Sequence, residues 1–202
     1  MQLILLSYLN LEGKTALVTV TSAKVATTYT STPSKDAENI ASNISSANAG
    51  RLVKAYKCNV RLRADVEATV DTVVHEIGGG RLDIVVTNAG IVEHVPAQYY
   101  PEDKFREIFD VNVKGTFWTA QSAARVSFIF TASVSATLIN RPQKQAAYNA
   151  SKAALIHLGK LLAVEGIDFT RVNLLTIHPN EWREQWHEMI PSPRFSKAAD
   201  LK

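Results

Sequence analysis

Short, unbroken apolar runs recur along this chain, and polar residues, glycine or proline bound each of them. Runs of this length are typical of strands that are buried on both faces of a parallel sheet. They predict strands over residues 16–20, 25–29, 82–86, 127–131 and 172–177.

Helical periodicity fills the intervals between these strands. Apolar residues between positions 66 and 77 recur at helical spacing behind Asp65, which we expect to cap that helix. The run Gly78-Gly79-Gly80 then ends it. Further helices are predicted over residues 103–109, 113 to about 125, and 146 to about 165. Strands that alternate with helices predict an α/β fold with a doubly wound parallel sheet, in which ligands bind beyond the carboxyl ends of the strands.

Composition and charge narrow the class of protein. A chain of 202 residues suits a single domain, residues 1–202, and the net charge of +3 is spread without a basic cluster, so no nucleic-acid partner is expected. The lone Cys58, expected in a strand, excludes an internal disulfide.

The five histidines have no metal-ligand spacing, and the apolar run 3–6 is too short for a membrane span. We expect a cytoplasmic protein without a metal or a membrane partner.

A tyrosine and a lysine stand four residues apart in the segment Tyr148-Asn149-Ala150-Ser151-Lys152, within the last predicted helix. Residues at this spacing share one helical face. A phenol, with a usual pKa of about 10, needs a lower pKa to exchange protons at neutral pH, and an adjacent ammonium favours the phenolate. The pair alone also fits an ordinary solvated helix face, so other residues must decide between a catalytic and a structural interpretation.

Serines follow the predicted strand 127–131. Ser135 lies thirteen positions before Tyr148, and its hydroxyl at the strand end would be able to hold a substrate oxygen. Ser133 is the near alternative for this role.

Five short motifs occur in order along the chain: TNAG at 87–90, DVNVKG at 110–115, S-x-S at 133–135, YNASK at 148–152 and RVN at 171–173. In identity and spacing they resemble the short-chain dehydrogenase/reductase family over about residues 11–193. The stretch 130–148 is similar to fungal-type polyol dehydrogenases and ketose reductases. The resemblance implies a Rossmann-like sheet and an oxidoreductase that interconverts a ketone or ketose and the corresponding secondary alcohol or polyol by hydride transfer.

The resemblance also implies a role for each matching residue. Tyr148 is then the general acid/base, and Lys152 lowers its pKa and holds the nicotinamide ribose. Ser135 orients the substrate oxygen, and Asn112 holds a water that links Lys152 to solvent. The residues expected at the cofactor are Ser31, Lys35, Asn59, Asn88, Ala89, Gly90, Tyr148, Lys152 and Pro179. Relatives pair through the helices that carry Asn112 and Tyr148, so a homodimer or homotetramer is expected.

The residues after the second predicted strand bear on the choice of dinucleotide. An NAD site places a carboxylate there to bind the ribose 2′-hydroxyl, and this charge would repel a 2′-phosphate. Residues 30–35 instead provide hydroxyls and Lys35, which favours NADP(H) over NAD(H). A capped helix start, without any role in cofactor binding, explains the same residues equally well.

The chain departs from the family where the pyrophosphate normally binds. The family has a turn of the form T-G-x-x-x-G-x-G after its first strand, followed by a helix, whereas residues 19–25 contain no glycine. Only a few residues separate the predicted strands 16–20 and 25–29, whereas a crossover between parallel strands needs a dozen residues or more. The first crossover helix is therefore expected to be missing, and either the strands leave their family positions or the N-terminal segment rearranges.

Further departures concern the cofactor and the C-terminal part. Asn59 stands where the family has an aspartate beside the adenine, and the expected Pro-Gly turn is reduced to His178-Pro179-Asn180. The sequence stops at Lys202, before the family's last helix and strand. These departures leave a second hypothesis: a catalytically impaired relative, or a non-catalytic binding protein, that retains the catalytic residues.

Overall fold

A computed structural model describes residues 14–17, 24–47, 52–80, 82, 84–123, 127–139, 141–165 and 169–173, with backbone alone for 14–17, 127 and 169–173. The strands are β1 (Lys14–Leu17), β2 (Lys24–Tyr29), β3 (Leu52–Lys57), β4 (Ile84–Thr87), β5 (Ser127–Thr131) and β6 (Phe169–Asn173). The helices are α1 (Ser34–Ala47), α2 (Arg63–Val73), α3 (Glu102–Phe109), α4 (Gly115–Ser122) and α5 (Ala146–Val164). Two π-helical turns, Val74–Gly78 and Asp110–Lys114, extend α2 and join α3 to α4.

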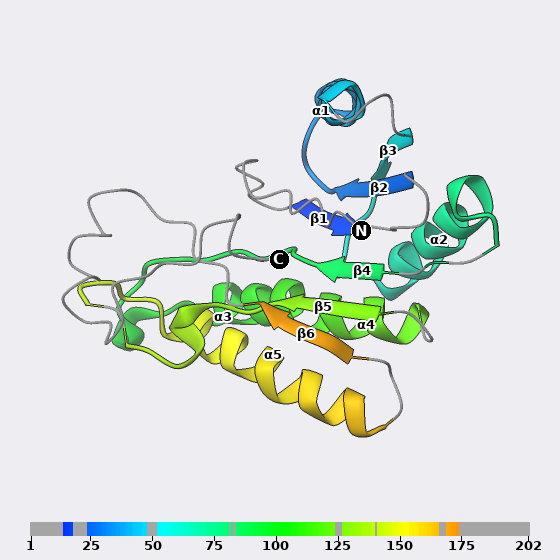
Figure 1. Cartoon of the computed structure of the whole chain (residues 1–202). Coiled ribbons are helices and arrows are strands. Elements are labelled where there is room, and N and C mark those ends of the chain that lie inside the picture. The colour runs from blue at the N-terminus through cyan, green and yellow to red at the C-terminus, as the bar shows by residue number, and fades with distance from the viewer. Residues whose placement is uncertain are drawn as a thin grey trace.

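The strands form two three-stranded groups that lie edge to edge. One group has the order β1-β2-β3 and the other the order β4-β5-β6. β1 lies next to β4, so the spatial order across the molecule is β3-β2-β1-β4-β5-β6 (Figure 1). Within the groups, β2 pairs with β3, β4 with β5, and β5 with β6 in parallel. The prediction of a doubly wound, Rossmann-like α/β fold is confirmed.

β1 is the exception to this parallel order. It pairs with β2 in the antiparallel sense, with Lys14 opposite Tyr29 and Leu17 opposite Ala26, and its arrow in Figure 1 points against that of β2. The chain between β1 and β2 comprises only residues 18–23, and a parallel crossover needs a dozen residues or more. As predicted, the connection is too short for the first crossover helix, and β1 keeps a central position beside β4 while running against β2.

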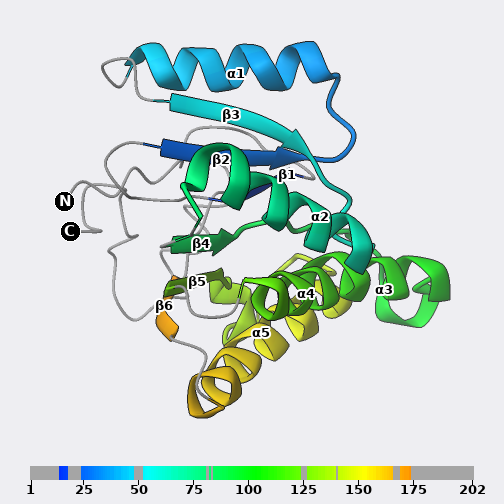
Figure 2. The same cartoon turned by 90° about the vertical axis from the view of Figure 1, so that its right-hand side faces the viewer.

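Helices α2, α4 and α5 lie together on one side of the sheet, and α1 packs against β3 (Figure 2). The periodicity that predicted α2 has a direct structural meaning, because Val66, Val70 and Val73 are all buried in the core. Phe128 and Phe130 of β5 belong to the same core and are fully buried. This packing holds the carboxyl ends of β4 and β5 beside the N-terminal turns of α5.

The ends of α2 were predicted with unequal success. The glycine run ends the helix as expected, since Gly79 has a φ of 64°, the left-handed conformation that favours glycine. Asp65 is not the cap, however. The helix begins at Arg63, with Leu62 at the capping position, and Asp65 lies in the first turn. Its carboxylate still favours the helix there, because the N-terminus carries partial positive charge.

The other boundaries differ in small ways from the predicted ones. β5 has the predicted bounds, whereas β4 lies at Ile84–Thr87 rather than 82–86. α4 starts at Gly115 because a π-helical turn occupies the preceding residues. β6 begins at Phe169, and the predicted residues 174–177 lie outside the described part. Cys58 is buried one residue after β3, not in a strand as predicted.

Candidate active site

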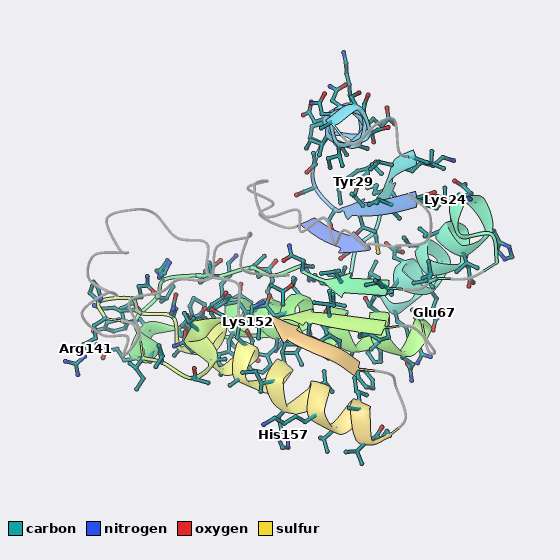
Figure 3. The ribbon with its side chains drawn as sticks, in the orientation of Figure 1. Lys24, Tyr29, Glu67, Arg141, Lys152 and His157 are labelled. Atoms are coloured by element: carbon teal, nitrogen blue, oxygen red, sulfur yellow. The ribbon has the colours of Figure 1, made fainter. Side chains whose placement is uncertain are left out.

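The predicted tyrosine and lysine project from the first turns of α5 at the carboxyl end of β5. Lys152 Nζ lies 5.7 Å from the centre of the Tyr148 ring and donates a hydrogen bond of 2.7 Å to the carbonyl of Thr131. Figure 3 shows Lys152 where α5 meets the ends of β5 and β6, with Tyr29 on the opposite half of the sheet. Only 3% of Lys152 is exposed, which argues against a solvated helix face.

Burial changes the proton affinity of this lysine. Removing the ammonium from water disfavours the charged form and lowers the pKa of Lys152 from 10.5 to about 8. At neutral pH the group is still mostly protonated. Proteins bury a lysine this completely only rarely, and a cation next to a phenol at a strand end is an arrangement suited to proton transfer.

The pKa of Tyr148 moves in the opposite direction from our prediction. Burial of the phenol raises its pKa, and a hydrogen bond with the Ser133 side chain lowers it by a smaller amount. The predicted lowering by Lys152 is not found, because desolvation of the phenolate is the dominant effect in this arrangement. The sequence spacing placed the two side chains together correctly but did not reveal how deeply both are buried.

Both candidate serines lie in the turn that follows β5. Ser133 is 1% exposed and Ser135 is 3% exposed. The backbone N–H of Ser135 donates to Ser133 Oγ at 3.2 Å, and the Gln145 side chain donates from Nε2 to Ser135 Oγ at 3.1 Å. The structure therefore brings both serines to the site, Ser133 bonded to Tyr148 and Ser135 bonded to a glutamine that the motifs did not indicate.

Asn112 is fully buried in the π-helical turn between α3 and α4 and connects three parts of the site. Its Oδ1 accepts from the backbone N–H of Ile91 at 2.8 Å, and its Nδ2 donates to the Ile91 carbonyl at 3.1 Å. The same Nδ2 donates to Ser151 Oγ at 2.9 Å, and Ser151 donates to the Tyr148 carbonyl at 2.7 Å. The predicted contact of Asn112 with water stays a prediction.

Ser151 was not among the predicted site residues, although it lies inside the YNASK motif. Its hydroxyl joins Asn112 to the backbone of α5 and so fixes the turn that carries Tyr148. A buried hydroxyl with both a donor and an acceptor partner is a satisfied structural group. Its position directly before Lys152 was the available sequence signal, but its partner is 39 residues away.

The segment Asn88-Ala89-Gly90 follows β4, as predicted, and passes close to the catalytic candidates. A Cβ at Gly90 would lie 3.3 Å from Lys152 Nζ and 3.5 Å from Asn112 Oδ1. A side chain at this position would lie tightly against the buried ammonium, which would have to shift by a few tenths of an ångström. The motif thus lies beside Lys152 at the carboxyl edge of the sheet, where ligands bind in doubly wound folds.

The predicted cofactor residues of the other half lie at the ends of β2 and β3. Ser31 and Lys35 are exposed after β2. Asn59 follows β3, and its Oδ1 accepts from the backbone N–H of Arg61 at 3.2 Å. Pro179 lies outside the described residues. The structure therefore places polar groups along the same edge as Lys152, and their contact with a cofactor remains a prediction.

Within the described ranges, no group of three or more histidine, cysteine, aspartate or glutamate side chains could hold a metal ion. No helix of that same part is both long and apolar enough to cross a bilayer.

The geometry and the motif order agree with the comparisons with known proteins. The sequence profile of the short chain dehydrogenase family matches residues 13–184. The chain belongs to this family. Sorbose reductase sou1 of Schizosaccharomyces pombe is 37% identical over 170 residues, which cover 75% of this chain and 66% of that protein.

Two further relatives show the same kinship. A probable NADP-dependent mannitol dehydrogenase of Yarrowia lipolytica is 33% identical over 198 residues, which cover 89% of this short-chain dehydrogenase and 69% of that protein. The NADPH-dependent 3-quinuclidinone reductase of Rhodotorula rubra has a similar structure, with a TM-score of 0.65 and 28% identity over 81% of this chain and 66% of that one. The chain spans about two thirds of the length of the curated relatives that it matches.

Proposed function

We propose that this short-chain dehydrogenase interconverts a ketone or ketose and the corresponding secondary alcohol or polyol, with NADP(H) as the second substrate. The observation that supports this most directly is the buried Lys152 ammonium beside Tyr148 at the carboxyl end of β5. The relatives named as a sorbose reductase and a mannitol dehydrogenase support the substrate class.

In this proposal Tyr148 is the general acid/base at the substrate oxygen. The phenol gives a proton to the oxygen during carbonyl reduction and becomes a phenolate, and the phenolate takes a proton from the hydroxyl during alcohol oxidation. A phenol with a raised pKa stays protonated at neutral pH, which suits the donation of a proton in the reductive direction. A nicotinamide cofactor, when bound, would supply or accept the hydride.

Lys152 and Ser135 prepare the site for that step. The Lys152 ammonium stabilises the phenolate that forms when Tyr148 gives up its proton. In the proposed reaction the Ser135 hydroxyl holds the substrate oxygen, and the bond from Gln145 keeps this hydroxyl at the strand end. Asn112 bonds both to the loop after β4 and to the first turns of α5, so it holds these two segments together.

The preference for NADP(H) rests on the residues at the carboxyl end of β2. The exposed hydroxyl of Ser31 and the exposed ammonium of Lys35 suit a 2′-phosphate, since both offer hydrogen-bond donors and Lys35 offers positive charge. The relatives named as NADP- and NADPH-dependent support the same choice.

A second candidate is a non-catalytic or impaired relative that retains the catalytic residues. The observation that favours it is the reversed direction of β1, which removes the strand-turn-helix unit that holds the pyrophosphate in this fold. Such a protein would keep the fold and the buried lysine but would not hold the dinucleotide productively.

The two candidates are separated by following the absorbance of NADPH with a panel of ketoses, and of NADP with a panel of polyols. Turnover that is lost in Tyr148→Phe supports the oxidoreductase. Turnover no faster than that of Tyr148→Phe on every substrate supports the non-catalytic candidate. Phenylalanine keeps the ring and removes only the hydroxyl, so the fold is retained in the control.

Assembly is a separate proposal. The helical segments that carry Asn112 and Tyr148 are formed, and the family resemblance implies pairing through them, so we propose a homodimer or homotetramer. Light scattering at high protein concentration tests it, and the mass of a single chain would reject it.

A further inference from the structure

Gln145 occupies a distinctive place at the start of α5. It is the residue before the first helical residue, and only 3% of it is exposed. Its backbone carbonyl accepts from the N–H of Asn149 at 3.0 Å, which fixes the residue in the first turn of the helix. Its side chain reaches back to the turn after β5, where Nε2 donates to Ser135 Oγ at 3.1 Å.

This bond determines how the Ser135 hydroxyl can be used. A serine hydroxyl offers one hydrogen to donate and two lone pairs to accept. The amide N–H of Gln145 occupies one lone pair, and an amide nitrogen cannot accept a hydrogen bond. The hydroxyl hydrogen of Ser135 must therefore point away from Gln145.

Resting on the proposed function, we propose that Gln145 is a positioning residue for this reaction. It orients the Ser135 hydroxyl so that its hydrogen is directed toward the substrate oxygen, next to the Tyr148 phenol. Because both side chains are buried, the orientation is held by a direct bond rather than by exchanging solvent. Gln145 itself acts through Ser135.

A change of hydrogen-bond polarity tests this role without a large change of shape. In Gln145→Glu the carboxylate can only accept, so it draws the Ser135 hydrogen toward itself. We expect kcat/KM for the ketose to fall by about 10-fold or more at neutral pH, as for the loss of one positioned bond. Activity should recover toward low pH, where the introduced carboxyl becomes protonated and can donate again.

The matched control is Gln121→Glu, the same change at an exposed position of α4. It should leave both kcat/KM and its pH profile as in the unmodified protein. A pH profile for Gln145→Glu that follows the profile of this control would overturn the positioning role.

A double-mutant cycle decides whether Gln145 works through Ser135. Gln145→Met removes the donor but keeps the length of the side chain. On the Ser135→Ala background, Gln145→Met should cause almost no further loss of kcat, and the free energies of unfolding in urea should also be non-additive. Losses in kcat that multiply would mean that the two residues act independently and would reject the proposal.

The unfolding measurement keeps this inference distinct from the proposed function. Turnover by the unmodified protein without coupling between the two residues would reject the role of Gln145 alone. No turnover by the unmodified protein, with the coupling in unfolding intact, would reject the oxidoreductase and leave the bond as a purely structural contact, which also overturns the positioning role.

Discussion

The two halves of the sheet differ in how closely they follow a doubly wound fold. In the half formed by β4, β5 and β6 all strands run in parallel, and their carboxyl ends meet α5. In the other half β1 runs against β2, and the short connection between them leaves no room for a crossover helix. The acid–base residues all come from the half formed by β4, β5 and β6, so their geometry does not depend on β1.

The half formed by β1, β2 and β3 affects dinucleotide binding rather than proton transfer. In a doubly wound fold, backbone N–H groups and the positive end of the first crossover helix stabilise the pyrophosphate. Reversing β1 moves its carboxyl end to the opposite edge of the sheet from the carboxyl end of β2. The comparison therefore predicts a chain in which proton transfer is well organised while dinucleotide binding is weak.

Removing the buried positive charge of Lys152, in the half formed by β4, β5 and β6, should have the largest effect on activity. With Lys152→Met the Tyr148 phenolate loses its stabilising neighbour, and we expect activity near neutral pH to fall by about 10²- to 10⁴-fold. Partial recovery of alcohol oxidation is expected at high pH, where the phenol ionises without help and can accept the alcohol proton. The pH–rate profile is the measurement, and a profile unchanged by the substitution would remove Lys152 from the mechanism.

Repairing the altered half should have the next largest effect. Inserting a glycine-rich turn and helix between Val20 and Val25 should restore two or three backbone hydrogen bonds to the pyrophosphate. Each contributes about 1.5–3 kcal/mol, so NADPH affinity should rise by about 10²-fold or more. Calorimetry measures the change, with a polar insertion of equal length and no glycine as the control. Equal affinities for both insertions would contradict the prediction.

The sequence predicted most of the intact half because its motifs are local. β5, α5 and the turn at Gly79 follow from apolar runs, helical periodicity and glycine. The bonds from Gln145 to Ser135 and from Asn112 to Ser151 join segments 10 and 39 residues apart, so no local pattern shows them.

The pKa of Tyr148 and the direction of β1 also depend on contacts between segments distant in sequence, so local patterns did not predict them. The pKa of Tyr148 depends on burial by the whole fold, and spacing to Lys152 predicted the wrong direction. The short link between β1 and β2 excluded a parallel crossover, but whether the strand would leave its place or reverse within it depends on contacts with β4.

Stability should reveal the cost of the buried lysine. The pKa of Lys152 is lowered from 10.5 to about 8, so between these values the unfolded chain binds more protons and the stability of the protein rises with pH. Below pH 8 the cost is about 3 kcal/mol, less the bond to Thr131 that is lost on substitution. Lys152→Met should therefore be more stable by about 1–3 kcal/mol at pH 7, and the gap should close by about pH 10.5.

Urea unfolding across this pH range measures the gap. Lys160→Met, at an exposed position on the same helix, is the control and should show no such pH dependence. A Lys152→Met protein that is less stable at every pH would mean that the ammonium stabilises the fold.

The smallest effect is expected at the end of β2. Lys35→Ala should raise KM for NADPH by about 3- to 10-fold and leave KM for NADH nearly unchanged, because one exposed charge contributes little in water. Steady-state kinetics with both dinucleotides measure the ratio. An equal change for NADPH and NADH would show that Lys35 does not contact the 2′-phosphate.

Calorimetric titration of NADPH into the unmodified protein tests the separation of the two halves most directly. The structure predicts saturable binding that is about 10²-fold weaker than that of a relative with an intact glycine-rich turn, because the remaining contacts come from the ends of β2, β3 and β4 and from Lys152. A dissociation constant in the low micromolar range or below, typical of an unimpaired enzyme, would contradict this prediction.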